Sequence, residues 1–89
     1  MSAKKTKQTF TVELAGATTE AQLHDRLAAS LPLPEYYGRN LDAFYDVLCE
    51  FGSGWRIVFR HAGAVATGLS EVCADAMRDV PGLEIVFED

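Results

Sequence analysis

Residues 32–51 read PLPEYYGRNLDAFYDVLCEF, and this stretch decides where the chain turns and where a helix restarts. Its two prolines end any preceding helix, because proline lacks a backbone N–H and restricts the residue before it. Asn40 is a favourable N-cap, so the sequence predicts a helix over residues 41–51. Gly38 suits a chain reversal that needs a positive φ, and an extra short turn of helix is expected at 33–38.

The predicted helix carries a row of acids, Asp42, Asp46 and Glu50, spaced four residues apart. Like charges at this spacing destabilise a helix by roughly 0.2–0.5 kcal/mol per pair. On a helical wheel at about 100° per residue, the row lies nearly opposite an apolar stripe. We therefore expect the stripe to pack on a sheet and the acids to face solvent, with Tyr45 at the boundary. The apolar stripe consists of Phe44, Val47, Leu48 and Phe51.

Charged helix faces are often only solvated surface, and Asp42 in the first turn also complements the helix dipole. Asp46 and Glu50 lie beyond that turn, however, and no basic side chain stands three or four residues from the row within the helix. Exposed tyrosine beside acids is typical of protein interfaces. The sequence therefore predicts a binding surface for a basic protein, flanked by the tyrosines Tyr36, Tyr37 and Tyr45.

The rest of the chain alternates between strand and helix patterns. Alternation of this kind predicts an α/β fold, in which a small, mainly parallel three-stranded sheet carries the helices in the order β-α-α-β-α-β. Residues 1–8 are expected to form a flexible polar tail and residues 9–89 a single domain. The expected elements are a strand at 9–14, a helix from a Thr19 capping box to about Ser30, the helix 41–51, a strand at 55–60, a helix from about Ala66 to Val80 and a strand at 83–89.

The net charge of −5 is unevenly distributed. Three of the eight basic residues lie in the first seven positions, and from residue 8 onward there are five basic and thirteen acidic side chains. Such a body repels phosphate backbones, so we expect no direct nucleic-acid binding. No apolar run approaches the ~20 residues that span a bilayer, and the basic start leads into no apolar signal region. We therefore expect a cytoplasmic protein without a membrane partner.

The cysteines and histidines predict no metal, cofactor or catalytic site. Cys49 and Cys73 match no zinc spacing and, in a reducing compartment, no disulfide. Cys73 falls on an apolar helical stripe and is expected in the core. His24 and His61 are expected at the surface or partly packed. An enzyme that uses Asp42 and Asp46 as a carboxylate pair is the less favoured alternative, which a turnover assay would test.

The segment PEYYGRNLDAFYDVL, residues 34–48, closely resembles the signature of the barstar family, intracellular inhibitors of barnase-type bacterial ribonucleases. Chain length, element order and the capping-box helix before the proline loop are also similar to that family over residues 9–89. The resemblance implies a barstar-like fold. It also implies one-to-one inhibition of a basic, extracellular-type bacterial ribonuclease by a protein that is monomeric when free.

The resemblance implies a role for each matching position. Tyr36 corresponds to the tyrosine that packs on the enzyme's catalytic histidine, and Gly38 to a glycine whose backbone approaches the partner. Asp42 corresponds to the first inhibitory aspartate. Asp46 corresponds to the dominant one, which occupies the phosphate site of the nuclease. The predicted partner-binding residues are Tyr36, Tyr37, Gly38, Arg39, Asn40, Asp42, Ala43, Tyr45, Asp46 and Glu50.

Several positions depart from the family pattern and leave the choice of nuclease open. Arg39 stands where the family has an acid, Tyr45 where it has a tryptophan and Val47 where it has a cysteine. A glutamate of the family's last helix aligns near residues 77–78, where only the neighbouring Asp79 offers a weak substitute. An acidic adaptor for a basic protein other than a nuclease uses the same helix face, so it stays an alternative. Loss of ribonuclease activity in the bound partner would separate the two.

Overall fold

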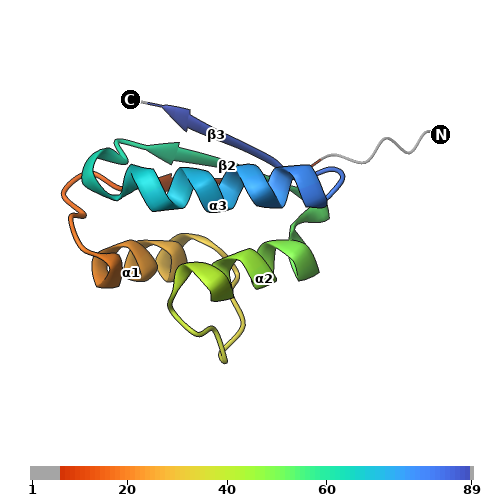
Figure 1. Cartoon of the computed structure of the whole chain (residues 1–89), viewed down its shortest axis with the longest axis horizontal. Helices are drawn as coiled ribbons and strands as arrows, with labels where there is room; N and C mark the ends of the chain where they lie inside the picture. Colours follow the sequence, from red (N-terminus) through yellow and green to blue (C-terminus); the bar gives the residue numbers. More distant parts are fainter. Residues whose placement is uncertain (1–6, 89) are drawn as a thin grey trace.

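The computed structural model describes residues 7–88 (Figure 1). Within them, three strands and three α-helices follow in the predicted order β-α-α-β-α-β, so the α/β fold class is confirmed. Of the predicted tail, residues 1–6 lie outside the described part, and the first strand begins at Gln8, one residue earlier than predicted. The bounds are β1 Gln8–Glu13, α1 Glu20–Ser30, α2 Leu41–Phe51, β2 Trp55–Arg60, α3 Ala66–Asp79 and β3 Glu84–Glu88, with short 3-10 helices η1 Gly52–Gly54 and η2 Gly63–Val65.

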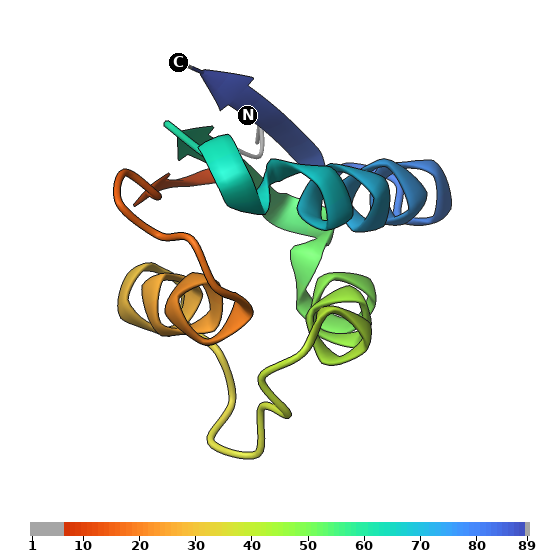
Figure 2. The same ribbon diagram turned by 60° about the vertical axis from the view of Figure 1, so that its left-hand side comes forward.

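The sheet is parallel throughout, in the order β1-β2-β3. Each strand reaches its neighbour through a helical crossover, which is the connection that parallel pairing requires. The register aligns Phe10 with Ile57 and Ile57 with Ile85. The helices lie on one side of the sheet, so the opposite side faces solvent (Figure 2). The sheet therefore has one apolar inner face and one charged outer face.

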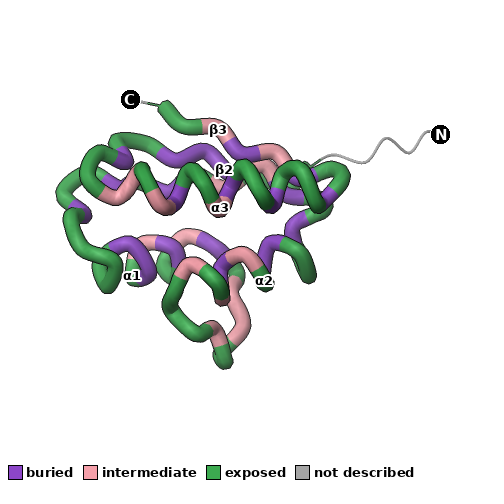
Figure 3. The backbone as a smooth tube through the Cα atoms, in the orientation of Figure 1, coloured by how far each residue is buried: buried purple, intermediate pink, exposed green. Residues whose placement is uncertain are grey.

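Apolar side chains from all three helices and all three strands form one buried cluster. Figure 3 marks the buried residues along the backbone of the helices and the sheet. Fully burying a single leucine or phenylalanine contributes roughly 1.5–3 kcal/mol, so this cluster supplies the main stabilisation. Cys73 is completely buried, as predicted. The cluster includes Leu23 and Leu27 of α1, Phe44, Val47 and Leu48 of α2, Leu69 and Ala76 of α3, and Val12, Ile57, Phe59 and Ile85 of the sheet.

Local signals fix the ends of several elements. Thr19 and Gln22 form the predicted capping box of α1, with the Thr19 hydroxyl accepting from the Gln22 N–H at 3.2 Å. Gly82 has a φ of 91°, and a Cβ there would stand 2.3 Å from the Ser53 carbonyl oxygen. Only glycine fits this turn, which leads the chain from α3 into β3.

The bounds of α2 are as predicted, but two predictions about residues next to it or at its end are wrong. The expected helical turn at 33–38 is a single hydrogen-bonded turn, in which the Tyr37 N–H donates to the Pro34 carbonyl at 3.0 Å. Phe51 was expected in the buried stripe but is 42% exposed. The next residue, Gly52, is buried, and a Cβ on it would lie only 3.3 Å from the Leu83 Cδ1.

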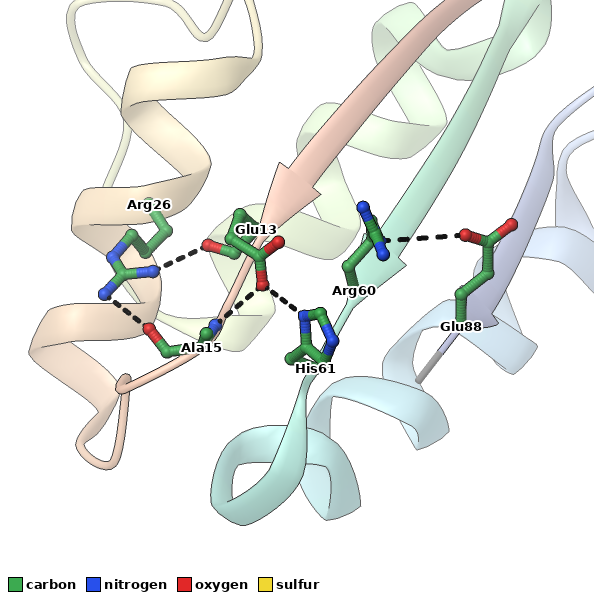
Figure 4. A network of polar contacts seen from close by, with 6 residues as sticks. All are labelled: Glu13, Ala15, Arg26, Arg60, His61 and Glu88. Atoms are coloured by element: carbon green, nitrogen blue, oxygen red, sulfur yellow. Dashed lines mark hydrogen bonds and ion pairs between the residues drawn. The ribbon is translucent and has the colours of Figure 1, made fainter.

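A polar network ties the ends of β1 and β2 to α1 (Figure 4). The Glu13 carboxylate accepts from the Ala15 N–H at 3.1 Å and contacts the His61 Nδ1 at 2.7 Å. Arg26 of α1 donates to the carbonyls of Glu13 and Ala15 at 2.7 and 2.9 Å. The hydrogen bond from His61 lowers the pKa of Glu13. The network holds the turn that follows β1 against α1 and against the end of β2.

Candidate functional site

The start of α2 is held by its N-cap, as predicted. The Asn40 side-chain oxygen accepts from the Ala43 N–H at 2.7 Å, and the Asn40 carbonyl accepts from the Phe44 N–H at 3.0 Å. Phe44 is completely buried beneath the helix. A capped helix with a buried anchor presents the side chains of its outer face in fixed directions.

The backbone before the cap differs from the prediction. Gly38 has an ordinary φ, and the left-handed residue is Arg39, with a φ of 58°. A Cβ on Gly38 would lie 3.2 Å from the Ala43 Cβ, which is tighter than most such contacts. Glycine therefore serves close approach of the loop to α2 rather than a positive φ.

Tyr37 turns inward and meets a buried histidine. Its hydroxyl lies 2.5 Å from the His24 Nδ1, and the His24 side chain is completely buried. Burial raises the pKa of Tyr37 and lowers the pKa of His24, so a protonated hydroxyl donates to a neutral imidazole. The proton of His24 then resides on Nε2, which has no hydrogen-bond partner among residues 7–88 and faces the Glu20 carboxylate at 3.5 Å.

The prediction of a surface or partly packed His24 is therefore wrong. The signal was available in its spacing, because His24, Leu27 and Leu31 follow at i, i+3 and i+7 on the buried side of the chain. The position of His24 on the apolar face of α1 is a stronger indicator of burial than the polarity of its side chain. Asp25, which pairs with Arg39, was also missed as a residue that supports the loop.

A pocket of about 240 Å³ lies between the loop and α2, and six of the ten predicted partner-binding residues line it. Tyr36 at its edge is 73% exposed, the largest exposed fraction among the exposed large apolar and aromatic side chains of the described chain. Asp46 and Glu50 are both exposed here, as predicted. We call it the loop pocket; it is lined by Tyr36, Tyr37, Gly38, Ala43, Asp46, Val47 and Glu50.

Asp42 and Tyr45 lie on the other flank of α2, beside α3. Tyr45 is partly buried and its hydroxyl donates to the Asp79 carboxylate, a bond that raises the pKa of Tyr45 and lowers that of Asp79. Asp46 lines the loop pocket, whereas Asp42 lines a second pocket on this flank. This second pocket, the α3 pocket, also measures about 240 Å³ and is lined by Asp42, Tyr45, Val72, Asp75, Arg78 and Asp79.

The row Asp42, Asp46 and Glu50 is exposed along its length. Across the described part of the chain, none of the ion pairs within 4.0 Å includes any of the three. The carboxylates thus retain their full capacity to accept hydrogen bonds from a cationic group. The arrangement can bind positive charge beside an exposed aromatic ring.

Residues 7–88 contain neither a metal-binding cluster nor a membrane-spanning helix. No three of their histidine, cysteine, aspartate and glutamate side chains are grouped as a metal ion would need. None of their helices has the length and apolar character needed to cross a membrane.

The sequence is also similar to proteins that are already known. YrdF of Bacillus subtilis (strain 168), whose name marks it as a candidate ribonuclease inhibitor, is 54% identical over 33 residues. That match spans 37% of this chain and 32% of YrdF, so it covers about a third of either protein. The profile of the family described as Barstar (barnase inhibitor) matches residues 7–88, almost the entire chain. The chain therefore belongs to the barstar family.

Proposed function

We propose that this protein inhibits a barnase-like bacterial ribonuclease, one to one, by inserting the acidic loop and α2 into the enzyme's active site. One observation carries the proposal. Asp46 projects from a capped, anchored helix into the loop pocket beside Tyr36, and no cation among residues 7–88 lies within ion-pair distance of it. The family membership and the name of the partial relative YrdF support the same function.

The mechanism is occupancy rather than chemistry. A ribonuclease active site gathers cationic side chains around the position of a phosphate. The Asp46 carboxylate can accept the same charge-assisted hydrogen bonds, so it takes the place of that phosphate. Tyr36 covers the neighbouring aromatic or histidine surface of the enzyme, and the backbone at Gly38 allows close approach. Substrate is excluded because its binding position is filled.

The other acids of the row act over a longer range. Asp42 and Glu50 raise the negative potential of the same helix face, which speeds encounter with a basic enzyme and makes association salt-dependent. The buried pairs formed by Asp46 mainly slow release. Electrostatic steering and hot spots are both characteristic of the barnase–barstar pair, so both effects are expected of a member of this family.

The proposal also explains why the chain tolerates the row. Repulsion between acids four residues apart costs free energy in the free protein, and a cationic partner removes that cost on binding. We place the inhibitor in the cytoplasm, where it protects the cell from a ribonuclease. The free thiols of Cys49 and Cys73 are consistent with such a reducing compartment.

Titration of the purified protein into a barnase-like ribonuclease, read out as RNA cleavage, tests the proposal. We expect complete inhibition at one equivalent, weakened by salt. Asp46→Ala should weaken binding by more than ~2 kcal/mol, as truncation of a hot spot does. Glu71→Ala, which removes an equal charge from an exposed position of α3, should change affinity little.

The possible results separate the alternatives. Equal losses in Asp46→Ala and Glu71→Ala would reduce the role of Asp46 to general charge. Binding of the nuclease without loss of RNA cleavage would contradict inhibition and favour an acidic adaptor. No binding at all would mean that another nuclease or another basic protein is the partner, and pull-down from the native host would identify it.

A further inference from the structure

The loop that precedes α2 is attached to α1 at two adjacent residues. The first attachment is the buried contact between the Tyr37 hydroxyl and the His24 Nδ1, at 2.5 Å. The second is an ion pair between the Arg39 guanidinium and the Asp25 carboxylate. Tyr37 and Arg39 enclose Gly38, so both sides of the glycine at the loop pocket are fixed to the same helix.

Arg39 adopts a backbone conformation that its residue type disfavours. Its φ is 58°, in the left-handed region that glycine populates readily and other residues seldom do. The neighbouring Gly38 has no such φ. A non-glycine residue remains left-handed only where its surroundings hold it there. The ion pair to Asp25 is the side-chain contact available to do so.

The direction of the Arg39 side chain also separates it from the acidic row. Among the described residues its ion-pair partner is Asp25 of α1, and no pair joins it to Asp42, Asp46 or Glu50. The loop therefore contributes a positive charge that is occupied by α1 and leaves the acids of α2 free. An arginine placed to contact a basic partner would instead oppose binding.

We infer that Arg39 is a positioning residue, which holds the loop in its binding conformation through its ion pair with Asp25 and does not itself bind the partner. The inference rests on the proposed function, and it assigns a role to a position where this chain departs from its family. A pre-formed loop avoids the entropy of ordering Tyr36 and Gly38 at the moment of binding. Loss of the ion pair should therefore shorten the lifetime of the complex.

Association and dissociation rates with a barnase-like ribonuclease test the inference on Arg39→Gln, Asp25→Asn and the double variant. Each single variant should dissociate about two- to five-fold faster, the size expected for one exposed ion pair. The double variant should be no worse than either single variant, because both remove the same contact. Its association rate should equal that of the wild type, since its net charge is unchanged.

Two controls separate positioning from general charge. Arg60→Gln makes the same charge change in an exposed ion pair with Glu88, on the outer face of the sheet, and should leave dissociation unchanged. Arg39→Lys keeps the charge, so its complex with the ribonuclease should live nearly as long as that of the wild type and longer than that of Arg39→Gln. Dissociation unchanged in Arg39→Gln, or effects that multiply in the double variant, would overturn the inference.

A measurement on the free protein keeps this inference distinct from the proposed function. Amide hydrogen exchange over residues 36–41 should accelerate equally in Arg39→Gln and Asp25→Asn, and not in Arg60→Gln. Unchanged exchange in the first two variants would overturn the positioning role. If the wild type binds no ribonuclease, the proposed function fails, and the exchange measurement alone still decides whether Arg39 holds the loop.

Discussion

The outer face of the sheet and the outer face of α2 both carry acidic side chains at the surface. Within residues 7–88, the acids of the sheet form ion pairs and those of α2 do not. On the sheet, Glu84 lies 3.3 Å from Arg56 and 3.5 Å from Lys7, and Glu88 lies 3.9 Å from Arg60. Glu13, at the end of β1, pairs with His61 (Figure 4). On α2, the three acids have no such partner within residues 7–88.

The difference concerns availability more than stability. An exposed ion pair contributes only about 0–1 kcal/mol, so the presence or absence of these pairs changes the free energy of unfolding little. The sheet satisfies its charges internally and offers little to a partner. The site region is instead held from beneath, by Phe44 under α2 and by the contact between Tyr37 and His24, and its surface charges remain free. Four predictions test this contrast.

The largest expected effect is the loss of the anchor under α2. Phe44→Ala should lower the free energy of unfolding by about 3–5 kcal/mol, because Phe44 is completely buried and leaves a cavity. Val58→Ala, on the outer face of the sheet, removes fewer buried atoms and should cost clearly less. Urea unfolding of both variants measures the difference. If both variants lost the same free energy of unfolding, Phe44 would be no more important to the fold than a valine on the outer face of the sheet.

The two adjacent tyrosines of the loop should behave differently. Tyr37→Phe leaves the buried His24 Nδ1 without its donor and should cost roughly 1–3 kcal/mol of unfolding free energy. Tyr36→Phe changes a side chain that is 73% exposed and should leave stability unchanged. Thermal or urea unfolding gives the comparison. A stable Tyr37→Phe would show that the contact with His24 does not hold the loop.

The two regions should also lose stability in different ranges of pH. The pKa of His24 is lowered from 6.5, so the unfolded state takes up a proton first and stability falls as the pH drops through 6.5. The pKa values of Glu13 and Glu84 are lowered from 4.5, mainly by His61 and Arg56 respectively. Their contribution is therefore present above pH 4.5 and is lost as the pH falls through their folded values.

Urea unfolding between pH 3 and pH 8 resolves the two ranges. His24→Gln should abolish the loss that starts near pH 6.5, and Glu84→Gln should reduce the loss below pH 4.5. A His24→Gln protein that keeps the upper transition would assign it to another group.

The smallest expected effect on stability comes from Glu50→Lys, which should change stability and ribonuclease binding in opposite directions. Glu50→Lys places a base four residues after Asp46 and should stabilise the free protein by about 0.3–0.5 kcal/mol while weakening ribonuclease binding. Glu88→Lys removes a pair with Arg60 and should slightly destabilise the fold without changing binding. Unfolding curves and inhibition titrations on both variants give the two signs. If Glu50→Lys left binding intact, the row would have no electrostatic role.

Sequence alone determined the order of elements, the ends of α2 and the exposure of its acids. These features depend on local signals, namely the Asn40 cap, the Thr19 capping box, the two prolines and the spacing of apolar residues. The same spacing predicted that Cys73 is buried. A residue's type and its near neighbours were sufficient because each of these outcomes is settled within one element.

Only the tertiary structure decided how the loop is held and how the site divides. Whether Gly38 or Arg39 takes the positive φ depends on how closely the loop approaches Ala43 and on Asp25 of another helix. The spacing of His24 places it on the buried face of α1, but its partner, the Tyr37 hydroxyl, comes from the loop, which no property of α1 alone reveals. That Asp42 and Asp46 line different pockets likewise depends on where α3 packs. Contacts between distant segments set these features, so local sequence patterns could not predict them.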